Sequence, residues 1–232
     1  MKVSFWSRVL DLISPRQCMV CGKRLAVTEH SVCSACYLHM PRTTYQFTPL
    51  DNLMTQLFWG QAPIERAASL MYYEPHSECA RLIYALKYGN HPDIGEDLGR
   101  MMAEEMMMAG YFDGIDVLLP VPLSRRRQRQ RGYNQSEMIC RGISEKTGIP
   151  VVTKAVRRLH FKQSQTALTR QQRQENVADM FELRDGSKLE GKHVLLVDDI
   201  CTTGATLTAC ADVLKAITGI RLSVLTLGFT KT

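Results

Sequence analysis

Residues 193–207 read HVLLVDDICTTGATL, and this stretch decides the fold. Its unbroken apolar run is typical of a strand buried on both faces, and the run leads directly into Asp198 and Asp199. A turn rich in hydroxyl groups follows, after which the residue pattern becomes helical. A buried strand, a loop and a helix in this order form the building unit of an α/β sheet, in which ligands bind at the carboxyl ends of the strands.

The loop after the two carboxylates suits a phosphate group. It offers hydroxyl and backbone N–H donors from Thr202, Thr203, Gly204 and Thr206. Glycine lets the backbone approach an anion closely, and the N-terminus of the following helix adds a favourable dipole. The carboxylates would repel a phosphate, so we expect them to accept hydrogen bonds from vicinal ribose hydroxyls of the same ligand. The stretch therefore predicts a ribose 5-phosphate site; the alternative is an acid pair that caps a threonine-rich helix start.

Strand and helix patterns alternate through the rest of the chain from about residue 63. The expected strands are 65–74, 116–122, 193–199 and 220–229, and the expected helices are 77–89, 95–110, 133–148 and 205–219. This alternation predicts an α/β domain over residues 63–232, with a parallel sheet flanked by helices. Residues 46–62 show no such pattern, and we expect them to form a linker or a loosely packed connection.

Two CxxC pairs precede this domain, Cys18-x2-Cys21 and Cys33-x2-Cys36, with eleven residues between them. Each pair directs two sulfurs to one ion, and four thiolates complete a tetrahedral Zn²⁺ site. The βαβ pattern of a thioredoxin-like redox motif is missing around both pairs. Because the protein would fill all four coordination positions, the zinc is structural or binds a partner. We therefore predict a zinc ribbon in an N-terminal domain of residues 1–45.

Composition and charge narrow the setting. The formal net charge of +6 favours anionic partners such as phosphates, nucleotides or nucleic acid. The sequence contains no apolar stretch long enough to span a bilayer. Charged residues interrupt the apolar run of residues 2–14, and a cleavage site does not follow it, so an amphipathic helix is expected there rather than a signal peptide. These features predict a cytoplasmic protein without a membrane span.

A run of five arginines lies in residues 125–131, after an expected strand that ends at Pro120, Val121 and Pro122. Guanidinium groups suit phosphate and diphosphate oxygens. Because the run follows a strand, we expect one or two of these side chains, Arg131 in particular, to border the ligand cleft. The others would face solvent or nucleic acid. Residues 162–181 are basic and glutamine-rich, and we expect either a mobile lid over a diphosphate or a disordered connector.

The 193–207 stretch resembles the phosphoribosyl-diphosphate motif of the type I phosphoribosyltransferases, a hydrophobic strand, two acids and a Thr-Thr-Gly-x-Thr loop. The resemblance implies that the acids bind ribose hydroxyls, that the loop holds the 5-phosphate, and that Mg²⁺ rides on the diphosphate and ribose oxygens. The ligand-binding residues expected from all these features are Val121, Pro122, Arg131, Asp198, Asp199, Ile200, Cys201, Thr202, Thr203, Gly204, Ala205 and Thr206.

The order of motifs along the chain narrows the resemblance. The cysteine pairs are followed by LKYG at 86–89, PVP at 120–122, RGYNQ at 131–135, a pattern of Gln165, Leu168, Arg173 and Asn176, and VDDICTTGAT at 197–206. This order resembles the ComF family of competence proteins, also called the ComFC or GntX type. The resemblance implies a role in DNA uptake and natural transformation, where imported single-stranded DNA is handled in the cytoplasm.

Three functions remain open from the sequence. In the first, the chain is an enzyme that displaces diphosphate from carbon 1 of phosphoribosyl diphosphate, although no acceptor pocket or general base is identifiable in the sequence. Alternatively, it is a non-catalytic binder of such a ligand or of single-stranded DNA. The arginines would then contact the DNA backbone, and bases would stack on Trp59, Tyr72, Tyr73 and Tyr133. Finally, it is an adaptor whose zinc ribbon docks a helicase or recombination partner.

Overall fold

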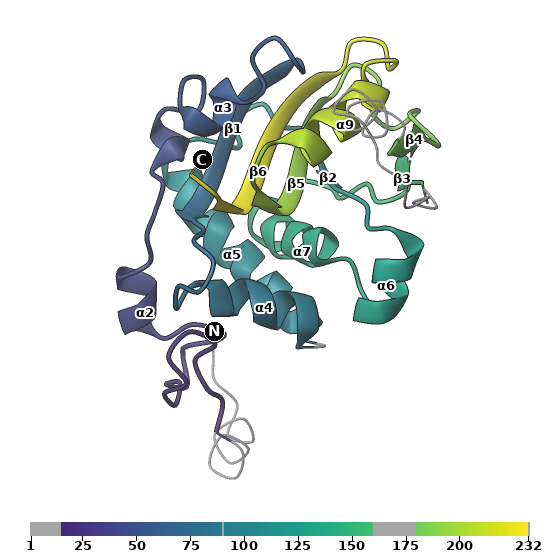
Figure 1. The fold of residues 1–232 in the computed structure, drawn as a ribbon. Helices are drawn as coiled ribbons and strands as arrows, with labels where there is room; N and C mark the ends of the chain where they lie inside the picture. The colour runs from purple at the N-terminus through teal and green to yellow at the C-terminus, as the bar shows by residue number, and fades with distance from the viewer. Residues whose placement is uncertain (1–14, 90, 160–179, 232) are drawn as a thin grey trace, which may run out of the picture.

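Four parallel strands form the central sheet, in the order β1-β6-β5-β2 (Figure 1). Their bounds are Ile64–Tyr72 for β1, Val117–Pro120 for β2, His193–Cys201 for β5 and Arg221–Phe229 for β6. The computed structural model describes residues 15–89, 91–159 and 180–231. The predicted α/β class with a parallel sheet is confirmed. Strand β5 continues to Cys201, two residues beyond the expected end at 199.

The register of β2 against β5 places the end of β2 next to Val197, within the longer strand β5. Pro120 pairs with Val197, and the N–H of Val121 donates to the carbonyl oxygen of Val197 at 2.9 Å. Strand β5 lies between β2 and β6, and its apolar half is fully buried. Val121 therefore follows the end of β2 next to Asp198, which still pairs with Thr226 of β6.

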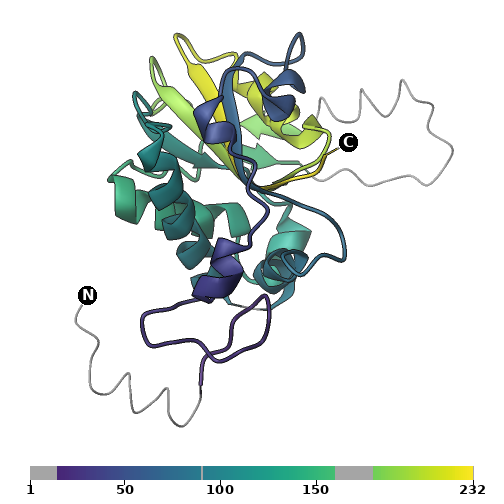
Figure 2. The ribbon, with the colours of Figure 1, turned by 90° about the vertical axis from the view of Figure 1, so that its left-hand side faces the viewer.

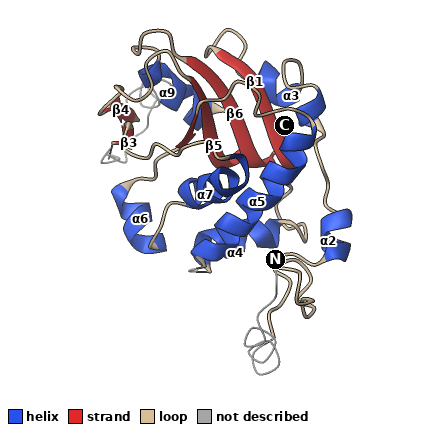
Figure 3. Ribbon diagram, turned by 180° about the vertical axis from the view of Figure 1, so that it is seen from behind, coloured by secondary structure: helices blue, strands red, loops and turns tan. Residues whose placement is uncertain are grey.

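Helices cover both faces of the sheet (Figure 3). Helices α4 (Ala80–Tyr88), α5 (Pro92–Met108) and α7 (Gln135–Thr147) lie on one face, and α9 (Ala205–Leu214) lies on the other. The connection from β1 to β2 and the connection from β5 to β6 cross the sheet in opposite directions. Right-handed crossovers in opposite directions place their helices on opposite faces, which accounts for the two layers.

Helices α5 and α7 approach closely because glycines lie at their contact. A Cβ atom added to Gly142 would lie 2.0 Å from the carbonyl oxygen of Glu96, and one added to Gly99 would lie 2.2 Å from that of Ile139. Any larger residue at these positions would force the helices apart. This contact fixes α7 against α5, and with it the first turn of α7, which borders the cavity described below.

The expectation of a linker at residues 46–62 is wrong. This segment contains a short 3-10 helix, η1 (Tyr45–Phe47), and α3 (Leu53–Gln56), and the side chains of Met54 and Phe58 are fully buried. Asn52 caps α3 and also donates to the carbonyl oxygen of Ala67 in β1 at 2.9 Å. A helix of four residues is too short to show a periodic pattern, so the sequence did not indicate this packing.

Three smaller elements complete the described chain. The arginine run forms helix α6 (Arg125–Arg131), capped by the side chain of Ser124. Strands β3 (Val156–Arg158) and β4 (Phe181–Leu183) form an antiparallel ribbon, and α2 (Ser34–Leu38) follows the second cysteine pair. Nearly all of the expected lid at 162–181 and the expected helix within 2–14 lie outside the described residues. Within the described residues, helices long and apolar enough to cross a membrane are not found.

Candidate functional site

A cavity of about 240 Å³ opens at the carboxyl edge of β2 and β5. Its wall includes Asp198 and Asp199, which end the apolar part of β5, and Val121 and Pro122, which follow β2. Parallel strands bring their carboxyl ends to one edge of a sheet, where loops leave room for a ligand. The cavity therefore lies at the place where the sequence predicts the ligand site.

Asp198 is held from two sides. One carboxylate oxygen, Oδ1, accepts hydrogen bonds from the Ser136 hydroxyl at 2.9 Å and from the backbone N–H of Asp199 at 2.9 Å. Burial, and next the neighbouring charge of Asp199, raise the pKa of Asp198 to about 7. Near neutral pH, this carboxyl is therefore protonated in some molecules and ionised in others.

Ser136 reaches Asp198 because Asn134 fixes the start of α7. The side-chain oxygen of Asn134 accepts from the backbone N–H of Ser136 at 3.1 Å, and its amide nitrogen donates to the carbonyl oxygen of Val121 at 3.1 Å. Asn134 thus ties the end of β2 to the first turn of α7. The end of β2, the first turn of α7 and strand β5 therefore meet at the Asp198 carboxylate.

Asp199 pairs with a lysine from another helix. Lys87, in the last turn of α4, places its Nζ 3.1 Å from Oδ2 of Asp199, and the two side chains are 20% and 14% exposed. Such partial burial weakens solvent screening, so this ion pair is stronger than one on the open surface. Lys87 lies in the LKYG motif, and that motif was the only sign of its role in the sequence.

The loop after β5 leads into the N-terminus of α9. Gly204 has a left-handed backbone with φ of +77° and begins α9, and side-chain caps are not made there. A Cβ atom at Gly204 would also lie 3.1 Å from the ring of Phe58. Asp198 and Asp199 do not cap this helix, which removes the alternative of an acid pair that serves as a helix cap.

The other expected loop residues divide into two groups. Ile200, Thr202 and Thr206 line the cavity. Cys201 is buried, whereas Thr203 and Ala205 are exposed and lie outside the cavity lining.

Four cationic side chains face the two carboxylates across the cavity: Lys87, Arg127, Arg131 and Arg158. Arg127 and Arg131 lie one turn apart on α6, so they share one face of that helix. Arg131 also donates to the side-chain oxygen of Gln135 at 2.9 Å. Burial, and next the charge of Arg127, lower the pKa of Arg158. More positive than negative charge therefore lines the cavity, as a polyanionic ligand requires.

Sequence reasoning missed several residues at this site, chiefly Lys87, Ser136 and Arg158. Most of them lie on elements distant in sequence from the acid pair, and only the fold brings them together. Among the four aromatic residues expected to stack on DNA bases, only Tyr73 lines the cavity. The Tyr133 hydroxyl instead donates to the carbonyl oxygen of Leu86 at 2.7 Å, and Tyr72 packs edge-on against Tyr45.

The four cysteines of the two CxxC pairs come together. Their sulfurs all lie within 4.8 Å of one another, and those of Cys21 and Cys33 are 3.8 Å apart. Four sulfurs each bound about 2.3 Å from a tetrahedral zinc would be separated by about 3.8 Å. Gly22, with φ of +73°, makes the tight turn after the first pair. The cluster can hold a metal ion, and its donor set fits zinc.

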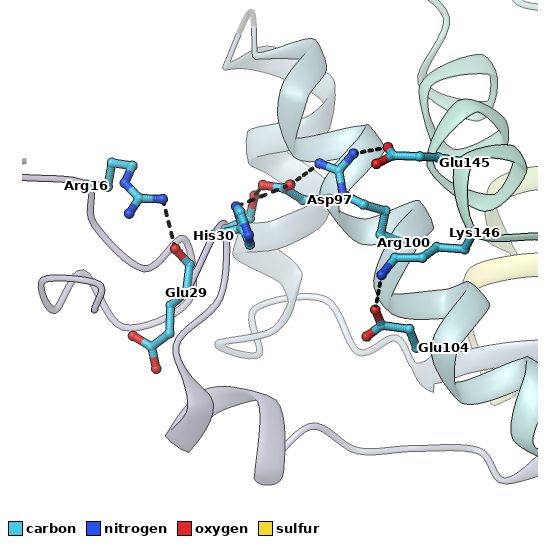
Figure 4. Close-up of polar contacts among 9 residues, drawn as sticks. Arg16, Glu29, His30, Asp97, Arg100, Glu104, Glu145 and Lys146 are labelled. Carbon is cyan, nitrogen blue, oxygen red and sulfur yellow. Dashed lines mark hydrogen bonds and ion pairs between the residues drawn. The ribbon is translucent and has the colours of Figure 1, made fainter. Parts of the chain in front are cut away.

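Polar contacts fasten this cysteine segment to α4 and α5, at the end of the molecule far from the sheet (Figure 2). Ser31 donates to a carboxylate oxygen of Asp97 at 2.6 Å, and Arg81 donates to the carbonyl oxygen of Val20 at 2.9 Å. Figure 4 shows Asp97 between His30 of the segment and Arg100 of α5, which also pairs with Glu145 of α7 at 2.6 Å. The cysteine segment is therefore attached to both α4 and α5.

Comparison with known proteins finds one domain family over part of the chain and relatives that align along nearly all of it. The family model "Phosphoribosyl transferase domain" matches residues 127–227, which include α6, the acid pair and α9. The DNA utilization protein YhgH of Escherichia coli K12 is 29% identical over 214 residues, covering 88% of this chain and 92% of that protein. Competence protein F of Haemophilus influenzae is 26% identical over 216 residues, covering 87% and 91%.

Competence protein ComFC of Bacillus subtilis is similar over a shorter region, with 34% identity over 97 residues that cover 42% of this chain and 37% of that protein. Relatives that align along nearly the whole chain, and a phosphoribosyltransferase match over residues 127–227, which include the acid pair, agree with the motif order and the parallel sheet. Together these matches support a type I phosphoribosyltransferase-like protein of the ComF family.

Proposed function

We propose that this chain binds phosphoribosyl diphosphate with Mg²⁺ at the cavity and transfers the phosphoribosyl group to a nitrogen nucleophile. One observation carries the proposal: two carboxylates, a hydroxyl-rich loop at a helix N-terminus and four cations line a single cavity of about 240 Å³. A phosphorylated sugar with a diphosphate needs these three kinds of partner at once.

Each part of the ligand has a chemically matched wall. The 5-phosphate would bind Thr202 and Thr206, where the dipole of α9 favours an anion. The ribose hydroxyls would donate to Asp198 and Asp199, which only accept when ionised. The diphosphate would lie toward the cations of α4, α6 and β3. The guanidinium groups of α6 and β3 can bind such oxygens with two parallel hydrogen bonds, and the Lys87 ammonium of α4 adds a point charge.

Carboxylate and ligand oxygens are the donors that Mg²⁺ prefers, so Asp198 and Asp199 together with the diphosphate fit this ion, which would neutralise leaving-group charge. In the transfer, the nucleophile forms a bond to carbon 1 while the bond from carbon 1 to the diphosphate oxygen breaks. The diphosphate leaves with the electron pair. Lys87, Arg127, Arg131 and Arg158 would stabilise the negative charge that develops on it.

The double variant Asp198→Asn/Asp199→Asn tests this assignment. Amides keep the shape of the carboxylates but remove charged acceptors, each worth about 1.5–3 kcal/mol in a hydrogen bond. Calorimetric titration with phosphoribosyl diphosphate and Mg²⁺ should show binding by the wild type and a loss of roughly 100-fold or more in the variant. The control Asp185→Asn/Asp212→Asn removes two exposed carboxylates elsewhere and should bind like the wild type. Absence of binding by the wild type contradicts the proposal.

Ionised Asp198 is costly in the free protein, and a hydrogen-donating ligand would relieve that cost. The folded-state pKa of about 7 lies above the ordinary value of 3.8 for an aspartate, so the protonated carboxyl stabilises the fold at low pH. This stabilisation is complete below the unfolded pKa and is lost as the pH rises through the folded pKa. The acid pair is therefore placed for ligand binding at the expense of stability.

The variant Asp198→Asn cannot lose this stabilisation because it does not titrate. Between pH 5 and pH 8, its free energy of unfolding should rise relative to the wild type by on the order of 1–3 kcal/mol. Urea unfolding of both ligand-free proteins at several pH values measures the difference. Asp212→Asn, which is exposed on α9, serves as the control and should stay parallel to the wild type. Parallel curves for Asp198→Asn would refute the raised pKa.

A second candidate function, binding of single-stranded DNA, is favoured by the outer face of α6. Arg125, Arg126 and Arg129 are exposed and lie outside the cavity lining. Cations in such a row suit a phosphodiester backbone. Within this proposal the chain acts in the cytoplasm, in DNA uptake and natural transformation, in keeping with relatives named for DNA utilization and competence.

The variant Arg125→Gln/Arg126→Gln/Arg129→Gln should bind a single-stranded oligonucleotide roughly tenfold more weakly. The slope of log affinity against log salt should flatten by about 2, because three phosphate contacts are lost. The control Arg184→Gln/Lys188→Gln/Lys192→Gln removes equal charge from another exposed region. Fluorescence anisotropy over a salt series measures both variants. Equal effects from the two would contradict a specific DNA site on α6, because they would show that only the net charge matters.

We also assign the N-terminal segment of residues 1–45 to a structural zinc module that docks a helicase or recombination partner. The variant Cys36→Ser should lose bound zinc, from about one ion per chain to almost none, and its melting temperature should fall, because zinc binding is coupled to folding. Elemental analysis of the purified protein gives the zinc content. Cys79→Ser, a partly buried cysteine outside the cluster, should retain the zinc. Full zinc content in Cys36→Ser would rule out the four-cysteine site.

A further inference from the structure

Helix α4 carries an exposed pair of tyrosines that the proposed function does not use. Tyr84 and Tyr88 are 50% and 66% exposed, and their rings stack with centroids 6.2 Å apart and planes inclined by 28°. The opposite side of α4 is buried in the core through Leu82, Ile83 and Leu86. The two tyrosines are therefore not needed to attach the helix to the sheet. Exposed aromatic surface of this size often marks a binding site.

The pair lies at the mouth of the cavity. Lys87, between the two tyrosines in sequence, reaches Asp199 inside the cavity. The guanidinium carbon of Arg131, a cavity-lining residue from α6, lies 5.5 Å from the centroid of the Tyr88 ring. On the other side, burial and next the adjacent Tyr84 raise the pKa of Tyr73, which also lines the cavity. Aromatic side chains thus continue from the cavity wall, at Tyr73, to the exposed face of α4, at Tyr84 and Tyr88.

We propose that Tyr84, Tyr88 and Arg131 form a platform on which a nucleobase stacks, next to the ribose of the bound phosphoribosyl diphosphate. The inference rests on the proposed function, since that function places carbon 1 of the ribose in the adjoining cavity. It names the class of ligand that the platform takes, a planar nitrogen heterocycle. The base belongs to a mononucleotide or to a single-stranded nucleic acid, two sources with the same stacking chemistry.

The chemistry of the platform favours a base over other ligands. Flat tyrosine rings beside a guanidinium plane bind heteroaromatic rings by stacking and cation–π contact, and every base has such a face. A role of the pair in helix stability alone accounts for the i, i+4 spacing, which stabilises helices weakly. It does not account for Arg131, which comes from another helix to cover the Tyr88 ring.

The test uses a fluorescent base, 2-aminopurine, whose emission is quenched when it stacks. Two probes are titrated against the full chain with saturating phosphoribosyl diphosphate and Mg²⁺: the 2-aminopurine ribonucleoside monophosphate, and an oligothymidylate that carries one 2-aminopurine. The variant Tyr84→Ala/Tyr88→Ala should bind the recognised probe roughly 10- to 100-fold more weakly. Tyr84→Phe/Tyr88→Phe keeps the rings and should restore binding to within about threefold. Phe47→Ala, an exposed ring elsewhere, should bind as the wild type does.

The outcomes separate this inference from the proposed function. Quenching by the monophosphate identifies a small-molecule source of the base, and quenching by the oligonucleotide alone identifies a nucleic acid; both support the platform. Unchanged affinity in Tyr84→Ala/Tyr88→Ala, or no quenching of either probe by the wild type, overturns it. Parallel loss of phosphoribosyl-diphosphate binding in that variant also overturns it, because the tyrosines would then support only the helix. A wild type that fails to bind phosphoribosyl diphosphate refutes the proposed function instead.

Discussion

The parallel pairing of β2 with β5 is the constraint on which the site depends. The hydrogen bond from Val121 to the carbonyl oxygen of Val197 lies at the end of β2, so the loop after β2 begins beside Asp198 of β5, which continues to Cys201. A shift of one residue would turn Asp198 to the opposite face of the sheet. Asn134 transmits the same register to α7, since it joins the backbone of Val121 to the turn that carries Ser136.

Charge explains why this edge of the sheet is a binding site rather than a packed one. Two adjacent, partly buried carboxylates repel each other, and the pKa of Asp198 rises accordingly. The neighbouring cations on α4, α6 and β3 likewise crowd positive charge around the cavity. Among the described residues that line the cavity, Lys87 and Asp199 form an ion pair. A ligand with hydroxyl donors at one end and a diphosphate at the other would balance both sets, which makes the site costly when free and favourable when bound.

The sequence predicted the part of the site that is continuous in the chain. The strand, the acid pair and the threonine loop could be recognised because their chemistry lies within residues 193–207. Lys87, Ser136 and Arg158 could not, because strand order and helix packing bring them from distant elements. The segment at 46–62 was misjudged for a related reason: Met54 and Phe58 are core residues, but the helix around them is too short to leave a pattern. Tyr84 and Tyr88 lie in a helix that the sequence predicted, but their proposed role in base stacking became apparent only from the contact of Arg131 with the Tyr88 ring.

The most direct test of the account is a crystal structure of the full chain with phosphoribosyl diphosphate and Mg²⁺. The account predicts electron density for the ribose against Asp198 and Asp199, for the 5-phosphate between Thr202 and Thr206, and for the diphosphate beside the arginines of α6. Density for the ligand elsewhere, or with the diphosphate in the threonine loop and the ribose away from the acid pair, would contradict it.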